Sequence, residues 1–505
     1  MSISFRRVSL NIFGLRGATL LINVFILSVS AKYFGLSLYR DIWVIATAFA
    51  INVNNAFFNP VSDVFRIKYV QVEESESSHS ALIKTGSLLV YYFIFLSCIC
   101  IAYQLWGKFI INHLYFGDAA TLQNYYYFIG LLLYSIFFTQ FISIGTGILN
   151  ANHIYYIPEI TFFFTSLCNL AIICLVTPYI GIYSLYVGQY FSLFVLLVCI
   201  LCFLKKNHVL PIFNFSSFSF QNAKPFILFG LPFYFPYIAG QASSLVEKSL
   251  SSKMGVGIIS MLDYAQKFTS SLQMVFTGII LTTIIPQLTK SFTKKETELY
   301  NKDFFNYLKF IFFVLSFVVP ILYVSSYEIN YIFFKRGEVS LKDIEAITSL
   351  TKLYAVAFIP ICLYCYITPA MISQMKNKLQ AVLAVLLQLL IIGFNYFFYK
   401  IFKQSVFALS LGIFHLITVL VMLYCISLRN KNKIYLYLAK SAAAMLVLLF
   451  LSETAYRFIH IGNVFLSLIV KSLIVAVMSA FLSSLFGINI FSYAKSILNR
   501  WKQKT

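Results

Sequence analysis

The chain has 505 residues, of which 60% are hydrophobic and only 11% are charged, and its formal net charge is +21. A soluble protein carries about a quarter charged residues. Here, apolar runs of roughly 20 residues, long enough to cross a hydrocarbon core, recur from end to end. The composition therefore predicts a polytopic membrane protein and excludes a soluble catalytic domain. The basic residues are dispersed through loops, as topology signals are, so we expect no nucleic-acid partner.

The apolar segments predict an all-α protein with about 14 transmembrane helices. Their approximate ranges are 10–33, 42–65, 82–106, 125–148, 155–177, 181–204, 226–249, 258–288, 305–327, 347–372, 379–401, 404–428, 433–452 and 462–487. An even number of spans places both termini on one side of the membrane. Loops on that side hold most of the Lys and Arg residues. The positive-inside rule therefore predicts cytoplasmic termini, including a basic C-terminal tail.

A faint internal duplication indicates how these helices are grouped. SVSAKYFG at 28–35 resembles SLSSKMG at 249–255, and a similar helix joint follows each copy, at 148–158 and 371–380. Six predicted helices separate the copies, so both would have the same orientation. We expect two six-helix lobes in parallel pseudo-repeat around a central cavity. The N-terminal lobe spans 1–224, the C-terminal lobe 225–430, and two extra helices with the tail 431–505.

The second predicted helix is rich in side-chain amides. Four asparagines lie just before Pro60, which breaks the helical hydrogen-bond ladder; they are Asn52, Asn54, Asn55 and Asn59. Asn52, Asn55 and Asn59 share one helix face at i, i+3 and i+7. Two interpretations stay open for this face: hydrogen bonds that hold helices together, and the lining of a polar cavity.

The predicted hairpin at 226–288 also carries polar side chains within apolar helices: Gln241, Glu247, Lys248, Asp263, Lys267 and Gln273. Ionisable groups at membrane depth cost a few kcal/mol each and usually face a protein interior or a wet cavity. Lys267 lies too deep in its helix to be purely interfacial, although its long stem can snorkel. We therefore expect this hairpin to form one wall of a polar pathway.

Other polar residues give weaker indications. Arg16 lies near the cytoplasmic end of the first helix, where it either meets an anionic headgroup or snorkels to the interface. Glu159 follows Pro158 at a helix start, where a carboxylate suits the positive helix end. The nine cysteines lie in apolar runs and lack the further ligands of a zinc site. With no Walker sequence and no acid–base set in a loop, we expect no metal, no cofactor and no catalytic residue.

Four stretches carry a resemblance to a known family. They are GLPFYFPYIAGQASSLVEKSLSSKMGVGIISMLDYAQKFTSSLQMVFTGIILTTIIPQLTKSF at 230–292, AKYFGLSLYRDIWVIATAF at 31–49, ILNANHIYYIPEI at 148–160 and IFFKRGEVSLKD at 332–343. Taken in chain order, they resemble the MviN/MurJ family of lipid II flippases, within the multidrug/oligosaccharidyl-lipid/polysaccharide exporter (MOP) superfamily. The resemblance implies a transporter rather than an enzyme, which moves a lipid-linked sugar pyrophosphate by alternating access.

The resemblance also implies the partners, the location and the site. The partners are an undecaprenyl-pyrophosphate-linked glycan and membrane lipids, the location is the bacterial cytoplasmic (inner) membrane, and we expect a monomer. The expected substrate-binding residues are Lys267, Arg16, Asn52, Asn54, Asn55, Asn59 and Gln241. The expected ion-coupling residues are Glu247, Asp263 and Asp41.

The chain departs from the family pattern at the cavity arginines. The family's arginines in helices 1 and 2 fall at Leu20, Ile26, Asn54 and Asn55, and its Ala-Asp-Arg in helix 8 reads Ala265–Gln266–Lys267. Arg forms bidentate phosphate contacts, whereas Lys is a point charge. The leading interpretation is therefore an exporter of a lipid-linked oligosaccharide or cell-wall precursor. Lipid II itself, or ion-coupled multidrug export within the same superfamily, are the alternatives.

Overall fold

The computed structural model describes residues 2–213, 218–280, 284–429, 431–456 and 461–485. These residues form helices and no strand, which confirms the predicted all-α class. They divide into two compact units: Met1–Ser260 with Arg336–Glu338, and Met261–Lys335 with Val339–Thr505. The predicted basic tail after 485 lies outside the described residues.

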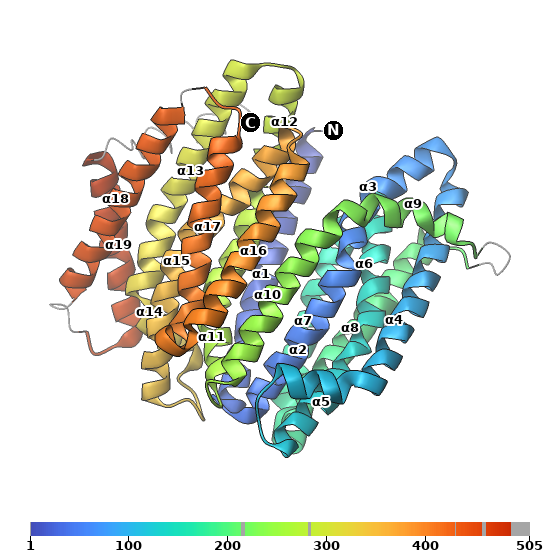
Figure 1. Cartoon of the computed structure of the whole chain (residues 1–505), viewed down its shortest axis with the longest axis horizontal. Coiled ribbons are helices and arrows are strands. Elements are labelled where there is room, and N and C mark those ends of the chain that lie inside the picture. The colour runs from blue at the N-terminus through green and yellow to red at the C-terminus, as the bar shows by residue number, and fades with distance from the viewer. Residues whose placement is uncertain (1, 214–217, 281–283, 430, 457–460, 486–505) are drawn as a thin grey trace. The chain divides into compact units, whose positions relative to one another are not determined.

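The first unit is built from the helices drawn in blue to green in Figure 1. They are α1 (Ser2–Phe34), α2 (Leu38–Phe57), α3 (Asn59–Ser75), α4 (Ser78–Leu114), α5 (Ala119–Leu133), α6 (Ser135–Ala151), α7 (Tyr156–Ile180), α8 (Tyr183–Lys206), α9 (Phe220–Gly230), the 3₁₀ turn η2 (Leu231–Phe233) and α10 (Tyr234–Ser252). α11 (Ile258–Ile279) begins in this unit. The apolar core of the unit includes the fully buried rings of Phe58, Phe65 and Tyr69.

The second unit contains the rest of α11 and the helices that follow it. They are α12 (Ile285–Thr293), α13 (Thr297–Val324), α14 (Ser326–Phe334), α15 (Leu341–Ser373), α16 (Asn377–Phe402), α17 (Ser405–Cys425), α18 (Lys431–Tyr456) and α19 (Val464–Leu485). α15 packs against α17, α13, α14 and α12, so it is the central helix of this unit. Its core includes Phe304, Phe358 and Tyr366.

Two ion pairs connect α18 and α19 to the other helices of the second unit. Lys471 of α19 pairs with Glu328 of α14, and Ser467 also donates to that carboxylate at 2.9 Å. Lys352 of α15 pairs with Glu453 of α18 at 2.9 Å. Because a charge inside a membrane is tolerated when it is paired, these contacts explain charged residues in otherwise apolar helices.

Fewer stretches than the 14 predicted spans are long and apolar enough by themselves to cross a membrane. Eleven stretches of helix are long and apolar enough to cross a membrane among the described residues, or twelve when the bent pair α2–α3 is counted as one span. The predicted count of 14 is therefore not confirmed. The two predicted spans that fail this test are 226–249 and 258–288, the polar hairpin. Its Gln, Ser, Glu, Asp and Lys residues lower the hydropathy of α10 and α11 below that of a lipid-facing helix.

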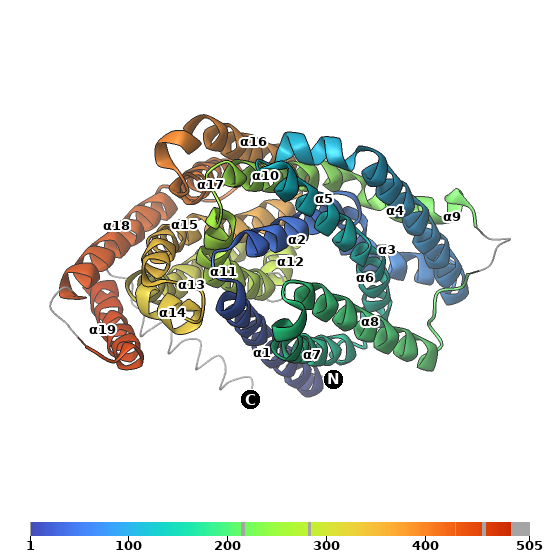
Figure 2. The same cartoon turned by 90° about the horizontal axis from the view of Figure 1, so that it is seen from below.

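The first compact unit extends beyond the predicted lobe boundary at 224/225. It reaches Ser260 because α9 packs on α3 and α4, and α10 packs along α2. Figure 2 shows α10 beside α2 from a second direction. The division into lobes at 224/225 stays a prediction that rests on the sequence repeat.

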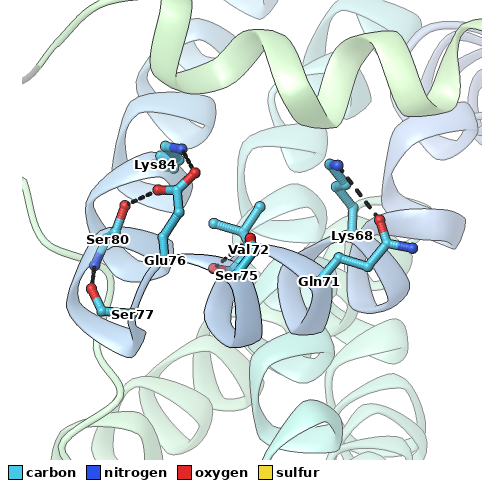
Figure 3. Close-up of polar contacts among 8 residues, drawn as sticks. All are labelled: Lys68, Gln71, Val72, Ser75, Glu76, Ser77, Ser80 and Lys84. Carbon is cyan, nitrogen blue, oxygen red and sulfur yellow. Dashed lines mark hydrogen bonds and ion pairs between the residues drawn. The ribbon is translucent and has the colours of Figure 1, made fainter.

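The turn between α3 and α4 is held by one carboxylate (Figure 3). Glu76 ends α3, forms an ion pair with Lys84 and accepts a hydrogen bond from the Ser80 hydroxyl at 2.5 Å. Ser77 caps α4 by accepting from the Ser80 N–H at 3.1 Å. The bond from Lys84, and next that from Ser80, lower the pKa of Glu76 below its usual range. The folded turn therefore favours the ionised form of the Glu76 carboxyl.

This shift gives a pH-dependent prediction for Glu76→Gln. A carboxyl whose pKa is lower in the folded chain stabilises above its unfolded pKa of about 4.3, and that contribution is lost as the pH falls through the folded value. We expect Glu76→Gln to lower the thermal midpoint by about one degree at neutral pH, because exposed pairs contribute under about 1 kcal/mol. The difference should vanish in acid. Glu74→Gln, an exposed neighbour, is the control, and an equal effect of both substitutions would contradict the assignment.

Candidate functional site

The bend between α2 and α3 positions the amide-rich segment. The two helices are bent by 46° at their junction. Pro60 has no backbone N–H to continue the ladder, so carbonyl groups near the end of α2 need other partners. The Phe58 N–H still donates to the Asn54 carbonyl at 3.0 Å. The Tyr234 hydroxyl, from α10, donates to the Phe57 carbonyl at 3.0 Å. The Tyr234 side chain of α10 therefore satisfies one of the backbone carbonyl groups at the bend.

Five side-chain amides form one chain of hydrogen bonds across this bend. We call this set, Gln140, Asn54, Asn59, Asn55 and Gln241, the amide ladder. Gln140 of α6 donates to Asn54. Asn54 donates to Asn59 at 3.2 Å, and Asn59 donates to Asn55 at 2.7 Å. Asn55 then donates to Gln241 of α10 at 3.4 Å. Four of the sequence-predicted residues thus come together in one network.

The ladder contains one member, Gln140, that the sequence analysis did not single out. Gln140 is only 3% exposed, and the Ser62 hydroxyl donates to its oxygen at 3.1 Å. In the sequence, the indication of this role is that Gln140 is a lone glutamine within the apolar segment 125–148. Conversely, Asn52 does not join the ladder: it is 4% exposed, and its Nδ2 has no hydrogen-bond partner among the described residues.

One face of α10 supports the bend. Tyr234, Tyr237 and Gln241 follow at i, i+3 and i+7, and each hydrogen-bonds to α2 or α3: Tyr234 to Phe57, Tyr237 to the Asp63 carboxylate and Gln241 to Asn55. Because these partners lie on both sides of the bend, the contacts with α10 stabilise the angle between α2 and α3. The polar side chains that lower the hydropathy of α10 thus form hydrogen bonds within the protein.

Asp41 has the contacts of a helix cap. It is 1% exposed, and its carboxylate accepts from the Gly257 N–H at 2.6 Å, the Ser260 N–H at 2.8 Å and the Ser260 hydroxyl at 2.6 Å. These groups lie at the start of α11, where backbone N–H groups lack helical partners. Gly257 has φ +85°, and an added Cβ would lie 2.6 Å from the Leu36 carbonyl oxygen, so only glycine fits there. Asp41 also lines a cavity of about 410 Å³.

Two other predicted residues of the first unit are engaged in ion pairs. Arg16 of α1 pairs with Glu159 of α7, and the Arg16 side chain remains 58% exposed. Glu159 contacts both Nε and Nη2 of the guanidinium, which leaves three of its five N–H donors for another partner. Glu247 pairs with the adjacent Lys248 at 3.0 Å, and both side chains are largely buried.

Lys267 and Asp263 lie in the second unit, on α11. Lys267 is half-buried, and no described residue forms an ion pair or hydrogen bond with its ammonium group. The preceding Gln266 donates to the Tyr354 hydroxyl at 2.6 Å. Gln273, two turns along, donates weakly to the Cys365 sulfur at 3.7 Å. The amides of α11 therefore pack against α15.

The chain matches the model of the family described as lipid II flippase MurJ over residues 30–497. Its structure is similar to that of lipid II flippase MurJ in an inward closed conformation, with a TM-score of 0.77 and 19% identity over 95% of this chain and 98% of that chain. A comparison with curated protein sequences gives no match.

More distant similarity is found to multidrug transporters. An inward-facing MATE family transporter of the MOP superfamily gives a TM-score of 0.63 at 14% identity, over 81% of this chain and 92% of that chain. A MATE transporter of Vibrio cholerae gives 0.55 at 12% identity, over 83% and 95% of the two chains. At these identities the likeness shows a shared fold alone.

The contacts of Asp41 predict a local effect on α11. Asp41→Ala removes the acceptor of two backbone N–H groups, and loss of a cap costs about 0.5–2 kcal/mol. We expect the amides of 257–260 to exchange with deuterium about 2- to 30-fold faster, measured by mass spectrometry. Asp41→Asn keeps one acceptor oxygen, so its exchange rate at 257–260 should lie between those of the wild type and Asp41→Ala.

Asp118→Ala is the matched control, because Asp118 lines the same cavity and caps α5 instead, through the Thr121 N–H at 2.9 Å. It should leave exchange at 257–260 unchanged. Unchanged exchange in Asp41→Ala would show that the cap does not protect this turn.

Proposed function

Because this chain belongs to the lipid II flippase MurJ family, we propose that it moves a lipid-linked oligosaccharide or cell-wall precursor from the inner to the outer leaflet of a bacterial inner membrane. Membership makes it a multi-pass membrane transporter rather than an enzyme. The proposed mechanism is alternating access, and the proposed orientation has both termini in the cytoplasm.

The amide ladder is the observation that supports a glycan as part of the cargo. Carboxamides present neutral donors and acceptors, which match the hydroxyl and acetamido groups of sugars. Asn54 and Asn55 occupy positions where the family resemblance implies arginines, so this part of the proposed site has amides in place of phosphate-binding cations. A cargo recognised partly through its sugar fits this exchange.

Lys267 and Arg16 supply the positive charge for the pyrophosphate in this proposal. The Lys267 ammonium has three donors without a described partner, and the Arg16 guanidinium keeps donors beyond those used by Glu159. Charge-assisted hydrogen bonds to phosphate are about twice as strong as neutral ones. Either cation by itself suits a phosphoryl group, which carries negative charge.

Asp41, Glu247 and Asp263 remain proposals for ion coupling. Asp41 lines a cavity, yet all its described contacts are those of a cap. Glu247 is neutralised by Lys248. A coupling ion would therefore have to displace an existing partner at either residue.

Lipid II itself is the second candidate, favoured by the family match. Expression of the chain in a bacterium depleted of its own lipid II flippase distinguishes lipid II from another lipid-linked oligosaccharide as the cargo. Restored growth would identify lipid II as a cargo. Failed rescue at normal protein levels, with another undecaprenyl-linked glycan accumulating when the chain is deleted from its own host, would identify the alternative cargo. If deletion causes no lipid-linked precursor to accumulate, the proposed function is wrong.

Lys267→Ala should impair transport without loss of the protein. A contact to a charged group contributes about 1.5–3 kcal/mol, so we expect precursor export to fall by at least about tenfold and precursor to accumulate in the inner leaflet. Lys267→Arg should retain most of the activity, since the charge remains. Lys302→Ala, at an exposed lysine of α13, is the control. Unchanged export in Lys267→Ala would remove Lys267 from the phosphate site.

A further inference from the structure

The amide ladder has a direction. Each of the first four members donates through its nitrogen to the oxygen of the next, from Gln140 through Asn54, Asn59 and Asn55 to Gln241. The Ser62 hydroxyl starts the series by donating to the Gln140 oxygen at 3.1 Å. Since a carboxamide has one donor end and one acceptor end, turning a single member would bring like groups together on both sides. The five amides therefore keep or reverse their direction together.

The last group of the ladder is a hydrogen-bond donor. Asn55 uses the Gln241 oxygen, and none of the described residues accepts a hydrogen bond from the Gln241 Nε2 group. Gln241 is half-buried, whereas Gln140 at the other end is 3% exposed. The ladder thus runs from a buried start to an accessible end, and the direction decides which end of the Gln241 amide faces outward.

We propose that Gln241 is the specificity-determining residue of the glycan site, and that buried Gln140 is the positioning residue that makes Gln241 a donor. The ligand group selected is a neutral acceptor oxygen of a sugar, such as a hydroxyl or an acetamido carbonyl. This inference rests on the proposed function and deepens it. It assigns roles to Gln140 and Ser62, which lie five and six hydrogen bonds away from the ligand.

Gln140→Glu tests the direction at a pH high enough to ionise the buried carboxyl, because a carboxylate only accepts hydrogen bonds. Asn54 must then turn to donate to it, and each following amide turns in the same way until Gln241 presents its oxygen. An acceptor oxygen of the sugar then meets another acceptor. Adding Gln241→Lys to this variant restores a donor at the end, since an ammonium donates both to the turned Asn55 oxygen and to the ligand. Gln241→Lys alone places its ammonium against the Asn55 donor.

The measurement is binding to the full chain in detergent by native mass spectrometry with two probes. One is undecaprenyl pyrophosphate carrying a single N-acetylglucosamine, and the other is undecaprenyl pyrophosphate alone. In the wild type we expect the sugar to strengthen binding about tenfold, the effect of one hydrogen bond to an otherwise unpaired group. Gln140→Glu should abolish this gain without weakening the probe that lacks the sugar. The double variant should regain it.

Gln241→Glu covers the case in which a carboxylate at the buried position prevents folding. It still accepts from Asn55 but presents an acceptor outward, so it too should lose the sugar-dependent gain. The inference is overturned if Gln140→Glu keeps the gain, if the double variant binds no better than Gln140→Glu, or if Gln241→Glu weakens both probes equally.

The two probes also separate this inference from the proposed function. If the wild type binds undecaprenyl pyrophosphate and the sugar adds nothing, the role of Gln241 is wrong while a pyrophosphate-lipid transporter stands. If it binds neither probe, both the proposed function and the inference fail.

Discussion

The bend between α2 and α3 is the constraint on which the described site depends. Lipid offers no hydrogen-bond partner to backbone or side-chain polar groups, so a break in a helix at membrane depth must be satisfied by the protein. Pro60 creates the break, and α10 supplies the Tyr234, Tyr237 and Gln241 side chains that meet it. The first unit therefore includes α10 because α10 is needed to complete the bend.

Paired and unpaired polar groups have different meanings in this chain. Lys471 with Glu328 and Lys352 with Glu453 satisfy each other within the second unit and attach its last helices. They explain why charges occur there without a transport role. The Lys267 ammonium and the outer end of Gln241 lack such partners among the described residues. Polar groups that the protein leaves available are the better candidates for contact with cargo.

In the proposed function, the family relationship and the amide ladder concern different parts of one cargo. A flippase for an undecaprenyl pyrophosphate lipid needs cations for the phosphates and neutral polar groups for the sugar. Arginine serves the first purpose through bidentate contacts, and carboxamides serve the second. An ordered series of amides has one further property that cations lack: it fixes a donor or an acceptor at its end. A substitution far from the ligand can therefore change selectivity without touching the ligand.

The sequence by itself determined the membrane class, the all-α fold, the helical breaks and the two polar segments, because hydropathy, proline and helical periodicity are local properties. It left the number of spans open, since the amides and charges of α10 and α11 keep these two helices from qualifying by hydropathy alone. Only the tertiary structure decided which polar groups meet. Gln140 joins Asn54 across 86 positions, and Arg16 pairs with Glu159 across 143. Asp41 caps the start of α11 across 216. Hydrogen-bond partners of this kind are set by how helices pack, and no local pattern records them.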